Sequence, residues 1–186
     1  MAENSRDKLI KTASRLFQLQ GYHATGLNQI TKESGAPKGS LYYHFPDGKE
    51  QLGVESVQLT TNFVSERIEK SLQRTDNACE AIQSFINSLA DQFQEEPFAD
   101  GIPIAAVALE TSLISEPLRN ACQNAYETFQ GIFTQKLIKS GYEKERAREL
   151  GIILNSMIEG AFLISFTMKD SNPLRLVAKQ IPAILK

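Results

Sequence analysis

Apolar residues recur along much of the chain every three to four positions, the spacing of one face of an α-helix. In the first such segment, residues 5–20, the pattern stops at Gly21, and glycine ends helices readily because it has no Cβ atom. No stretch shows the convincing alternation of apolar and polar residues that marks a half-buried strand, and no repeat or low-complexity tract is present. The pattern predicts an all-α protein.

Glycine and proline divide this pattern into successive helices. We expect helices over residues 5–20, 25–34, 37–44, 48–74, 77–95, 104–113, 115–140, 143–168 and 173–185, the last of them bent or restarted near Pro182. The segment 95–103 contains two prolines and a glycine, so it is the clearest predicted loop. The long helix from residue 48 would join an N-terminal domain, residues 1–48, to a larger helical domain, residues 49–186.

The most informative local pattern is the pair of short helices 25–34 and 37–44, which has the form of a helix-turn-helix. Thr25 is expected to cap the first of these helices through its side-chain oxygen. Gly35 supplies the left-handed residue that ends it. Pro37 favours the start of the second helix, where its missing N–H group has no helical partner to lose.

In the second short helix, Leu41 and Phe45 lie four residues apart on the face predicted to pack inward. The remaining positions carry groups suited to binding nucleic acid, namely Lys38, Gly39, Ser40, Tyr42, Tyr43 and His44. A lysine reaches a guanine edge or a phosphate, hydroxyl and imidazole groups donate to phosphates, and a glycine lets the backbone approach a groove closely. We therefore predict that this helix docks on DNA.

Residues 5–52 resemble the DNA-binding domain of the TetR family of bacterial repressors. The matching motifs occur in order: Ala13-Ser-Arg-Leu-Phe17, Gly21-Tyr22, Gln29-Ile30, Glu33-Ser-Gly35, Lys38-Gly-Ser-Leu-Tyr-Tyr-His-Phe45 and Lys49-Glu50-Gln51-Leu52. This ordered set is more specific than a generic helix-turn-helix pattern. One departure is the connection Pro46-Asp47-Gly48, which is one residue longer than usual in the family. The resemblance implies a bacterial, cytoplasmic regulator associated with the nucleoid.

The resemblance also implies further contacts to DNA. Thr25 and Lys49 are predicted to bind phosphates, Lys49 from the start of the next long helix. Asn28 would either reach a base edge or remain solvated, and both interpretations stay open. His23 is interpreted as a loop residue.

The second half of the chain resembles a narrower subgroup of the family, the lincomycin-resistance-type and flavonoid-responsive repressors. The motifs that carry this resemblance are Gly101-Ile-Pro103, Glu110-Thr-Ser112 and Ser115-Glu-Pro-Leu-Arg119. The resemblance implies a helical body that binds a small effector and forms a homodimer, through helices near residues 117–140 and 143–168. It also implies a palindromic double-stranded DNA operator, and an effector such as a flavonoid or a drug.

The segment 143–168 supports a dimer on physical grounds as well, because it is apolar over more than one face. One side would pack on its own subunit, and the excess predicts a second partner; the alternative is the central core helix of a monomer. Gly151 and Gly160 would permit close helix approach. A polar Asn155 and an ionisable Glu159 argue against a membrane span.

Candidate effector-binding residues are mostly aromatic: Phe63, Phe85, Phe93, Phe129, Phe133 and Phe162, together with Val107 and the carboxylates Glu110 and Glu159. Phenylalanines lining a cavity would suit a flat hydrophobic ligand, although phenylalanine at helical spacing equally forms ordinary core. A carboxylate in an apolar helix requires a partner. Each of these two glutamates therefore either faces a pocket or lies at a surface or an interface.

Charge and composition add limits on function. The 186-residue chain has a formal net charge of −2, but residues 1–50 carry +2 and the remainder −4, so the predicted DNA-binding segment is the basic part. Both histidines lie in that segment, and Cys79 and Cys122 follow no metal-ligand or redox spacing. We therefore predict neither catalysis nor a metal or cofactor. The prediction is a dimeric repressor released by a small aromatic ligand; the alternative is a constitutive helical DNA-binding protein.

Overall fold

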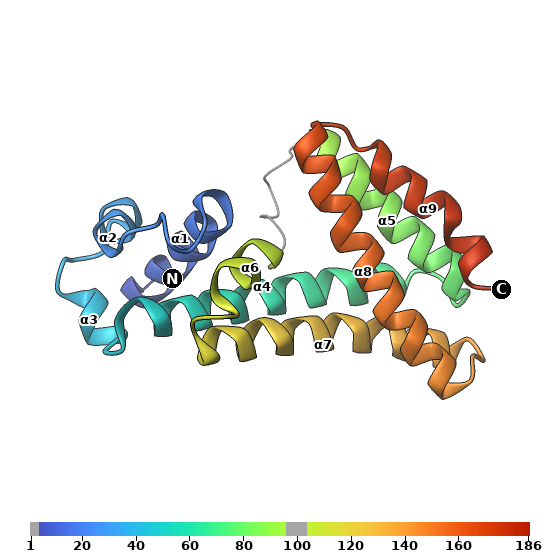
Figure 1. The fold of residues 1–186 in the computed structure, drawn as a ribbon, viewed down its shortest axis with the longest axis horizontal. Helices are drawn as coiled ribbons and strands as arrows, with labels where there is room; N and C mark the ends of the chain where they lie inside the picture. Colours follow the sequence, from blue (N-terminus) through green and yellow to red (C-terminus); the bar gives the residue numbers. More distant parts are fainter. Residues whose placement is uncertain (1–3, 96–103) are drawn as a thin grey trace. The chain divides into compact units, whose positions relative to one another are not determined.

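The computed structural model describes residues 4–95 and 104–186 (Figure 1). The helices are α1 (Ser5–Gln20), α2 (Leu27–Ser34), α3 (Ser40–His44), α4 (Gly48–Leu72), α5 (Ala78–Glu95), α6 (Ala105–Thr111), α7 (Glu116–Lys139), α8 (Lys144–Met168) and α9 (Asn172–Ile184). The described ranges contain no strand, which confirms the all-α prediction. The predicted loop 95–103 falls almost wholly outside the described residues.

The helices group into two compact units that do not coincide with the predicted domains. Unit 1 comprises residues 1–63 and 101–125, and unit 2 comprises residues 64–100 and 126–186. Unit 1 therefore takes α6 and the first parts of α4 and α7 in addition to the three N-terminal helices. Both long helices, α4 and α7, contribute residues to both units.

The core of unit 1 forms where α1 meets α2 and α3. The contributing side chains are almost fully buried: Leu9, Ala13, Leu16, Phe17, Ile30, Leu41, Phe45 and Leu52. Asn4 begins α1, since its Oδ1 accepts a hydrogen bond from the Asp7 backbone N–H at 2.9 Å, and Gly21 ends it with a φ of 87°. The predicted inward face of α3, Leu41 and Phe45, is confirmed.

Unit 2 is built around α5, α8 and α9, and α5 lies alongside α9 (Figure 1). Its core contains Ile82, Phe85, Ile86, Phe133, Leu137, Leu150, Leu154, Leu174 and Ile181. Gly151 allows α8 to pack closely on α7, because a Cβ atom at this position would lie 2.4 Å from Thr134 Oγ1 and 2.8 Å from the Gln130 carbonyl oxygen. The predicted close approach is confirmed at Gly151. At Gly160, in contrast, the described part of the chain places nothing within 4 Å of such a Cβ.

Helix α9 continues through Pro182, so it does not restart there, and the alternative of a bend at this proline stays a prediction. Proline has no N–H group to donate to the carbonyl four residues before it, here that of Ala178. The Gln83 side chain donates to that carbonyl instead, with an Nε2–O distance of 3.1 Å. A side chain from α5 thus replaces the hydrogen bond that the proline removes.

Candidate nucleic-acid interface and effector region

The turn between α2 and α3 follows the predicted local chemistry. Gly35 adopts the left-handed conformation, with a φ of 64°, and ends α2. Ser34 Oγ donates to the Thr31 carbonyl at 3.0 Å and accepts from the Ala36 N–H at 3.2 Å. Ala36 is buried, so the chain is held on both sides of the glycine.

Helix α3 begins three residues later than predicted, at Ser40 instead of Pro37. The Pro37 carbonyl accepts from the Ser40 N–H at 2.9 Å and from Ser40 Oγ at 2.7 Å. Pro37 therefore opens a turn of the 3₁₀ type that leads into a helix of only five residues. Lys38 and Gly39 lie in that turn, where both are exposed.

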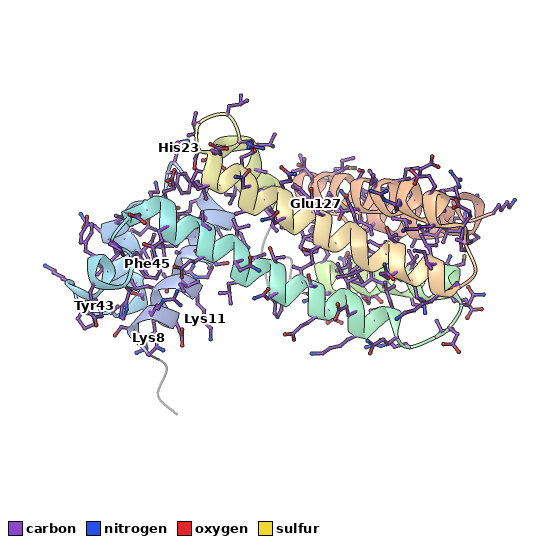
Figure 2. All side chains as sticks on the ribbon, turned by 90° about the horizontal axis from the view of Figure 1, so that it is seen from below. Lys8, Lys11, His23, Tyr43, Phe45 and Glu127 are labelled. Carbon is purple, nitrogen blue, oxygen red and sulfur yellow. The ribbon has the colours of Figure 1, made fainter. Side chains whose placement is uncertain are left out.

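The two adjacent tyrosines of α3 point away from the core of unit 1. Tyr42 is 65% exposed and Tyr43 is 82% exposed, whereas Leu41 and Phe45 are 2% and 0% exposed. Figure 2 shows Tyr43 at the surface and Phe45 among the helices. Ser40 and His44 are half-buried at the edge of the same surface. The structure thus brings together the residues predicted for DNA docking from Lys38 to His44.

Thr25 does not have its predicted role. Its side chain is fully buried, and Oγ1 donates to the Gly21 carbonyl at 2.8 Å and to the Leu16 carbonyl at 3.3 Å. The residue that caps α2 is Gly26, without a side-chain hydrogen bond, so the capping prediction is wrong. Because the hydroxyl is used at the end of α1, Thr25 presents no exposed side chain to a phosphate.

Lys49 lies over the turn between α1 and α2. Its Nζ is 4.5 Å from the centre of the Tyr22 ring and donates to the His23 carbonyl at 3.4 Å. Partial burial lowers the pKa of Lys49, and the nearby carboxylate of Glu110 opposes this shift. A phosphate contact by Lys49 would have to replace or extend these interactions. Asn28, on α2, is exposed.

The Glu110 side chain reaches the same turn from α6. Its Oε2 accepts a hydrogen bond from the His23 backbone N–H at 2.8 Å. This contact joins residues 87 positions apart and lies within unit 1. This contact uses one oxygen of the Glu110 carboxylate, and the pocket role of Glu110 stays a prediction.

A second carboxylate connects the starts of two long helices within unit 1. Ser115 Oγ donates to Glu50 Oε2 at 2.7 Å and accepts from the Leu118 N–H at 3.2 Å. Ser115 therefore caps α7. The role of Glu50 was not predicted, since its partner is 65 residues away.

Several charged side chains around the helix-turn-helix form ion pairs with one another. Arg15 bonds Glu33 at 2.5 Å and so joins α1 to α2, while Arg6 pairs with Glu55 and lies 5.7 Å from the centre of the Phe45 ring. Hydrogen bonds from Gln29 and then Arg15 hold the pKa of Glu33 below its ordinary value. These exposed pairs fix side-chain positions and contribute little to stability.

The predicted effector-binding residues are divided between the two units. Phe63, Val107 and Glu110 belong to unit 1, where Phe63 is 49% exposed and Val107 lines a small depression together with Phe17 and Thr60. The other six lie in unit 2. Of these, Phe85, Phe129 and Phe133 are buried, and the ring centroids of Phe85 and Phe133 are 6.1 Å apart.

Phe93 of α5 is also buried, and it contacts Phe162 of α8. The Phe93 and Phe162 rings meet edge to face, with centroids 5.8 Å apart, and Glu159 precedes Phe162 by one helical turn on α8. Glu159 Oε2 is buried and has no hydrogen-bond partner in the described structure. Burial raises the pKa of Glu159 to about 7. Among the predicted effector-binding residues, Glu159 therefore offers a buried oxygen that is free to form a hydrogen bond.

The two cysteines are the residues that could support redox chemistry. Cys79 and Cys122 are free thiols, and burial raises the pKa of Cys122 to about 11, so this thiol is protonated at neutral pH. Among residues 4–95 and 104–186, no three His, Cys, Asp or Glu side chains are placed to hold a metal ion.

An all-helical chain with a glycine turn and a short helix that exposes two tyrosines defines a helix-turn-helix DNA-binding protein. Residues 9–55 match the family model described as bacterial regulatory proteins, tetR family. Residues 78–180 match the C-terminal domain of LmrA/YxaF-like transcriptional regulators. The chain belongs to the TetR family of bacterial transcriptional regulators, and members of this family are regulators, not enzymes.

Two relatives from Bacillus subtilis (strain 168) are similar over almost the whole chain. The HTH-type transcriptional regulator YxaF is 51% identical over 183 residues, which cover 98% of this chain and 96% of that protein. The HTH-type transcriptional regulator LmrA is 47% identical over 183 residues, covering 98% and 97%. The predicted family and subgroup are both confirmed.

Solved structures agree with the fold. A TetR transcriptional regulator from Legionella pneumophila superposes with a TM-score of 0.85 at 22% identity, covering 100% of this chain and 99% of that one. The reduced form of E. coli NemR gives a TM-score of 0.84 at 22% identity, covering 97% of each chain. At this identity the likeness concerns the fold alone.

Proposed function

We propose that the protein is a homodimeric repressor that binds an inverted-repeat operator and is released from it by a small aromatic effector. The observation that carries DNA docking is the outward exposure of Tyr42 and Tyr43 on α3, opposite the buried Leu41 and Phe45. Two such helices in a symmetric dimer would enter major grooves one DNA turn apart, about 34–36 Å. The protein would act in the bacterial cytoplasm, at the nucleoid.

Each exposed group of this surface has a proposed partner on DNA. Lys38 and the backbone at Gly39 approach base edges, because both precede α3 and are exposed. Ser40, Tyr42, Tyr43 and His44 contact phosphates and fix the register. Asn28 contributes from α2, and Lys49 reaches a phosphate from the edge of the same surface. Thr25 is buried beneath this surface, and its hydrogen bonds to the end of α1 help to fix the start of α2.

The proposed subunit contact is centred on α8. Its outward face carries large apolar side chains, Ile152, Ile153, Leu163, Ile164 and Met168, which are between 41% and 61% exposed. Large exposed apolar patches on soluble proteins often mark sites of protein contact. Leu176 of α9 is 51% exposed as well. The exposed side of α7 carries polar residues, such as Arg119, Asn120 and Gln135, so α7 offers less to this contact than the sequence suggested.

By length and composition alone, α8 is also apolar enough to cross a membrane. The charged residues that open the helix, including Glu145, Arg146 and Arg148, and the buried Asn155 favour a protein contact instead. A single apolar helix of this kind is common in the cores and interfaces of proteins outside membranes.

The proposed effector site lies in unit 2, beside Glu159 and the Phe93–Phe162 pair. Aromatic edges there would contact a flat ligand, and the unpartnered Glu159 oxygen would bond a hydroxyl or carbonyl group of that ligand. Flavonoids have both features and agree with the subgroup, and drugs of similar chemistry are further candidates. Binding would favour a conformation of the dimer in which the two α3 helices cannot dock together, and a preference of about 1–3 kcal/mol is enough.

The test is selection of genomic fragments bound by the full-length protein, over a series of salt concentrations and with flavonoids and lincosamides as probes. The proposal predicts a short inverted repeat, affinity that falls steeply with salt, and release by one class of compound. Sequence-specific binding that no compound weakens would favour a constitutive DNA-binding protein. Absence of duplex binding would exclude α3 as the recognition helix.

A further inference from the structure

The peptide groups of His23 are held from both sides by two other elements. Glu110 Oε2 on α6 accepts from the His23 N–H at 2.8 Å. Lys49 Nζ on α4 donates to the His23 carbonyl at 3.4 Å while lying over the Tyr22 ring. All of these residues belong to unit 1. The turn between α1 and α2 is therefore clamped by an acid from one side and a base from the other.

Gly21 allows the carboxylate to come this close. It has a φ of 87°, and a Cβ atom at this position would lie 2.1 Å from Glu110 Oε1 and 3.0 Å from Glu110 Cδ. The glycine thus ends α1 and leaves the space that the Glu110 side chain fills. Backbone conformation and side-chain packing are two independent signs that this contact is a built part of unit 1.

The clamped turn determines how α2 leaves α1. Thr25 Oγ1 bonds the Gly21 and Leu16 carbonyls, which fixes the far end of the turn to α1. Between these anchors, Glu110 bonds the N–H group of His23, a residue that is otherwise exposed. A hydrogen bond from a backbone N–H to a carboxylate is stronger than one between neutral groups. Loss of this bond would leave the entry to α2 restrained mainly by Thr25 and Lys49.

We propose that Glu110 is a positioning residue for DNA binding: from α6 it holds the α1–α2 turn, and through this turn the orientation of α2 and α3. This inference rests on the proposed function, namely that the protein binds operator DNA through α3. Glu110 itself contacts no DNA. Its carboxylate also lies near Lys49, and it opposes the effect of burial on that ammonium group. An element distant in sequence from the helix-turn-helix thus sets the geometry with which α3 meets its groove.

The experiment compares E110A, E110Q and the matched control E116A in the full-length protein. Glu116 belongs to the same unit, and its carboxylate pairs only loosely with Arg119 on the surface, at 3.7 Å. E116A therefore removes the same charge without touching the turn. E110Q keeps an oxygen that accepts the His23 N–H but loses the charge, so it separates the hydrogen bond from electrostatics.

Three quantities are measured: amide hydrogen exchange over residues 21–25, affinity for the selected operator, and unfolding temperature. E110A is expected to speed exchange at His23 and to weaken operator binding about tenfold, in line with loss of one charge-assisted hydrogen bond. E110Q should fall between E110A and the unmodified protein, and E116A should match the latter. Because no DNA contact is removed, the salt dependence of binding should stay unchanged in E110A.

Two results would overturn the inference. Faster exchange in E110A with unchanged operator affinity would mean that the turn does not transmit its position to α3. Unchanged exchange would mean that the clamp does not restrain the turn. If the unmodified protein binds no duplex, the proposed function fails and this role fails with it; operator binding that is equal in E110A and the unmodified protein removes this role alone. If E110A fails to fold, E110Q still reports exchange and affinity.

Discussion

Helices α3 and α8 both expose large apolar side chains, but the two surfaces differ in what they can bind. On α3 the exposed side chains are Tyr42 and Tyr43, each of which ends in a hydroxyl group, and His44 lies beside them. On α8 they are Ile152, Ile153, Leu163, Ile164 and Met168, whose side chains have no group that forms a strong hydrogen bond. The polar atoms among the exposed side chains therefore distinguish the two surfaces. The first surface suits phosphates and grooves, and the second suits a copy of itself.

The two surfaces also differ in how they are supported. Helix α3 has five residues, too few to be stable alone, and depends on Leu41 and Phe45 for its position. Helix α8 has 25 residues, and its buried side is fixed on α7 through Gly151. We therefore expect substitutions on α3 to act locally on DNA binding, and those on α8 to act on assembly or stability.

The largest effect is expected from a charge on the exposed face of α8. Ile164→Asp would place a carboxylate in an apolar subunit contact, where it cannot be solvated. The dimer should dissociate, and operator affinity should fall on the order of a thousandfold because the two α3 helices no longer bind together. Sedimentation equilibrium and operator titration measure the two effects.

Arg148→Gln is the control for this substitution, because it makes the same change in net charge near the charged start of α8. It should leave the dimer intact. If Ile164→Asp remains dimeric, the subunit contact does not include this face of α8.

The next effect concerns Glu159, an ionisable residue in the apolar part of α8. Burial raises its pKa to about 7 from an ordinary 4.5, so the folded state holds the proton more tightly than the unfolded state. The free energy of unfolding should therefore decrease as the pH rises from about 4.5 through 7, by up to about 3 kcal/mol. Denaturant titrations from pH 5 to pH 8.5 should show this decrease, and Glu159→Gln should largely abolish it. Identical pH dependence in both proteins would place the carboxylate in contact with water.

Substitution of two glycines of α8 compares the cost of an added methyl group on its buried and exposed sides. Gly151→Ala should destabilise the protein by about 1–3 kcal/mol, because the new Cβ would overlap Thr134 Oγ1 and the Gln130 carbonyl. Gly160→Ala meets no described atom within 4 Å and should cost much less, or stabilise the helix slightly. Both are read from denaturant unfolding. An equal loss for Gly160→Ala would show that a second subunit covers Gly160 closely.

The smallest effect separates the ring of an α3 tyrosine from its hydroxyl group. Tyr43→Ala should weaken operator binding about tenfold, equivalent to about 1.4 kcal/mol, with no change in dimerisation. Tyr43→Phe should retain affinity if the ring supplies the contact and resemble Tyr43→Ala if the hydroxyl bonds a phosphate. Both variants are measured by operator titration at one salt concentration. Unchanged affinity in both would remove Tyr43 from the docking surface.

Sequence patterns predicted those features that depend on near neighbours. The inward pair Leu41 and Phe45 follows from helical periodicity, and the end of α2 at Gly35 follows from the lack of a Cβ atom. Close packing at Gly151 was expected for the same reason, although the partner helix was not identified. In each case the sequence signal is a local one, a helical spacing or a residue without a Cβ atom.

Features that depend on distant parts of the chain were missed or misassigned. Thr25 has a capping residue's chemistry, but its hydroxyl bonds the end of α1 because the folded turn brings those carboxyl-terminal carbonyls within reach. The contact of Glu110 with the His23 N–H was missed because the two residues are 87 positions apart. No periodicity records such a contact, since it is decided by the packing of α6 on α1.

Unit 1 is assembled from two separate stretches of chain, residues 1–63 and 101–125. A single recombination crossover therefore cannot exchange the whole of unit 1, and with it the DNA-binding specificity, between two regulators. A chimaera that takes residues 1–48 from another regulator would pair a foreign turn with the resident Glu110 and Lys49. A transplant of α6 together with the N-terminal helices would keep these residues matched, so inheritance of the two stretches should be linked.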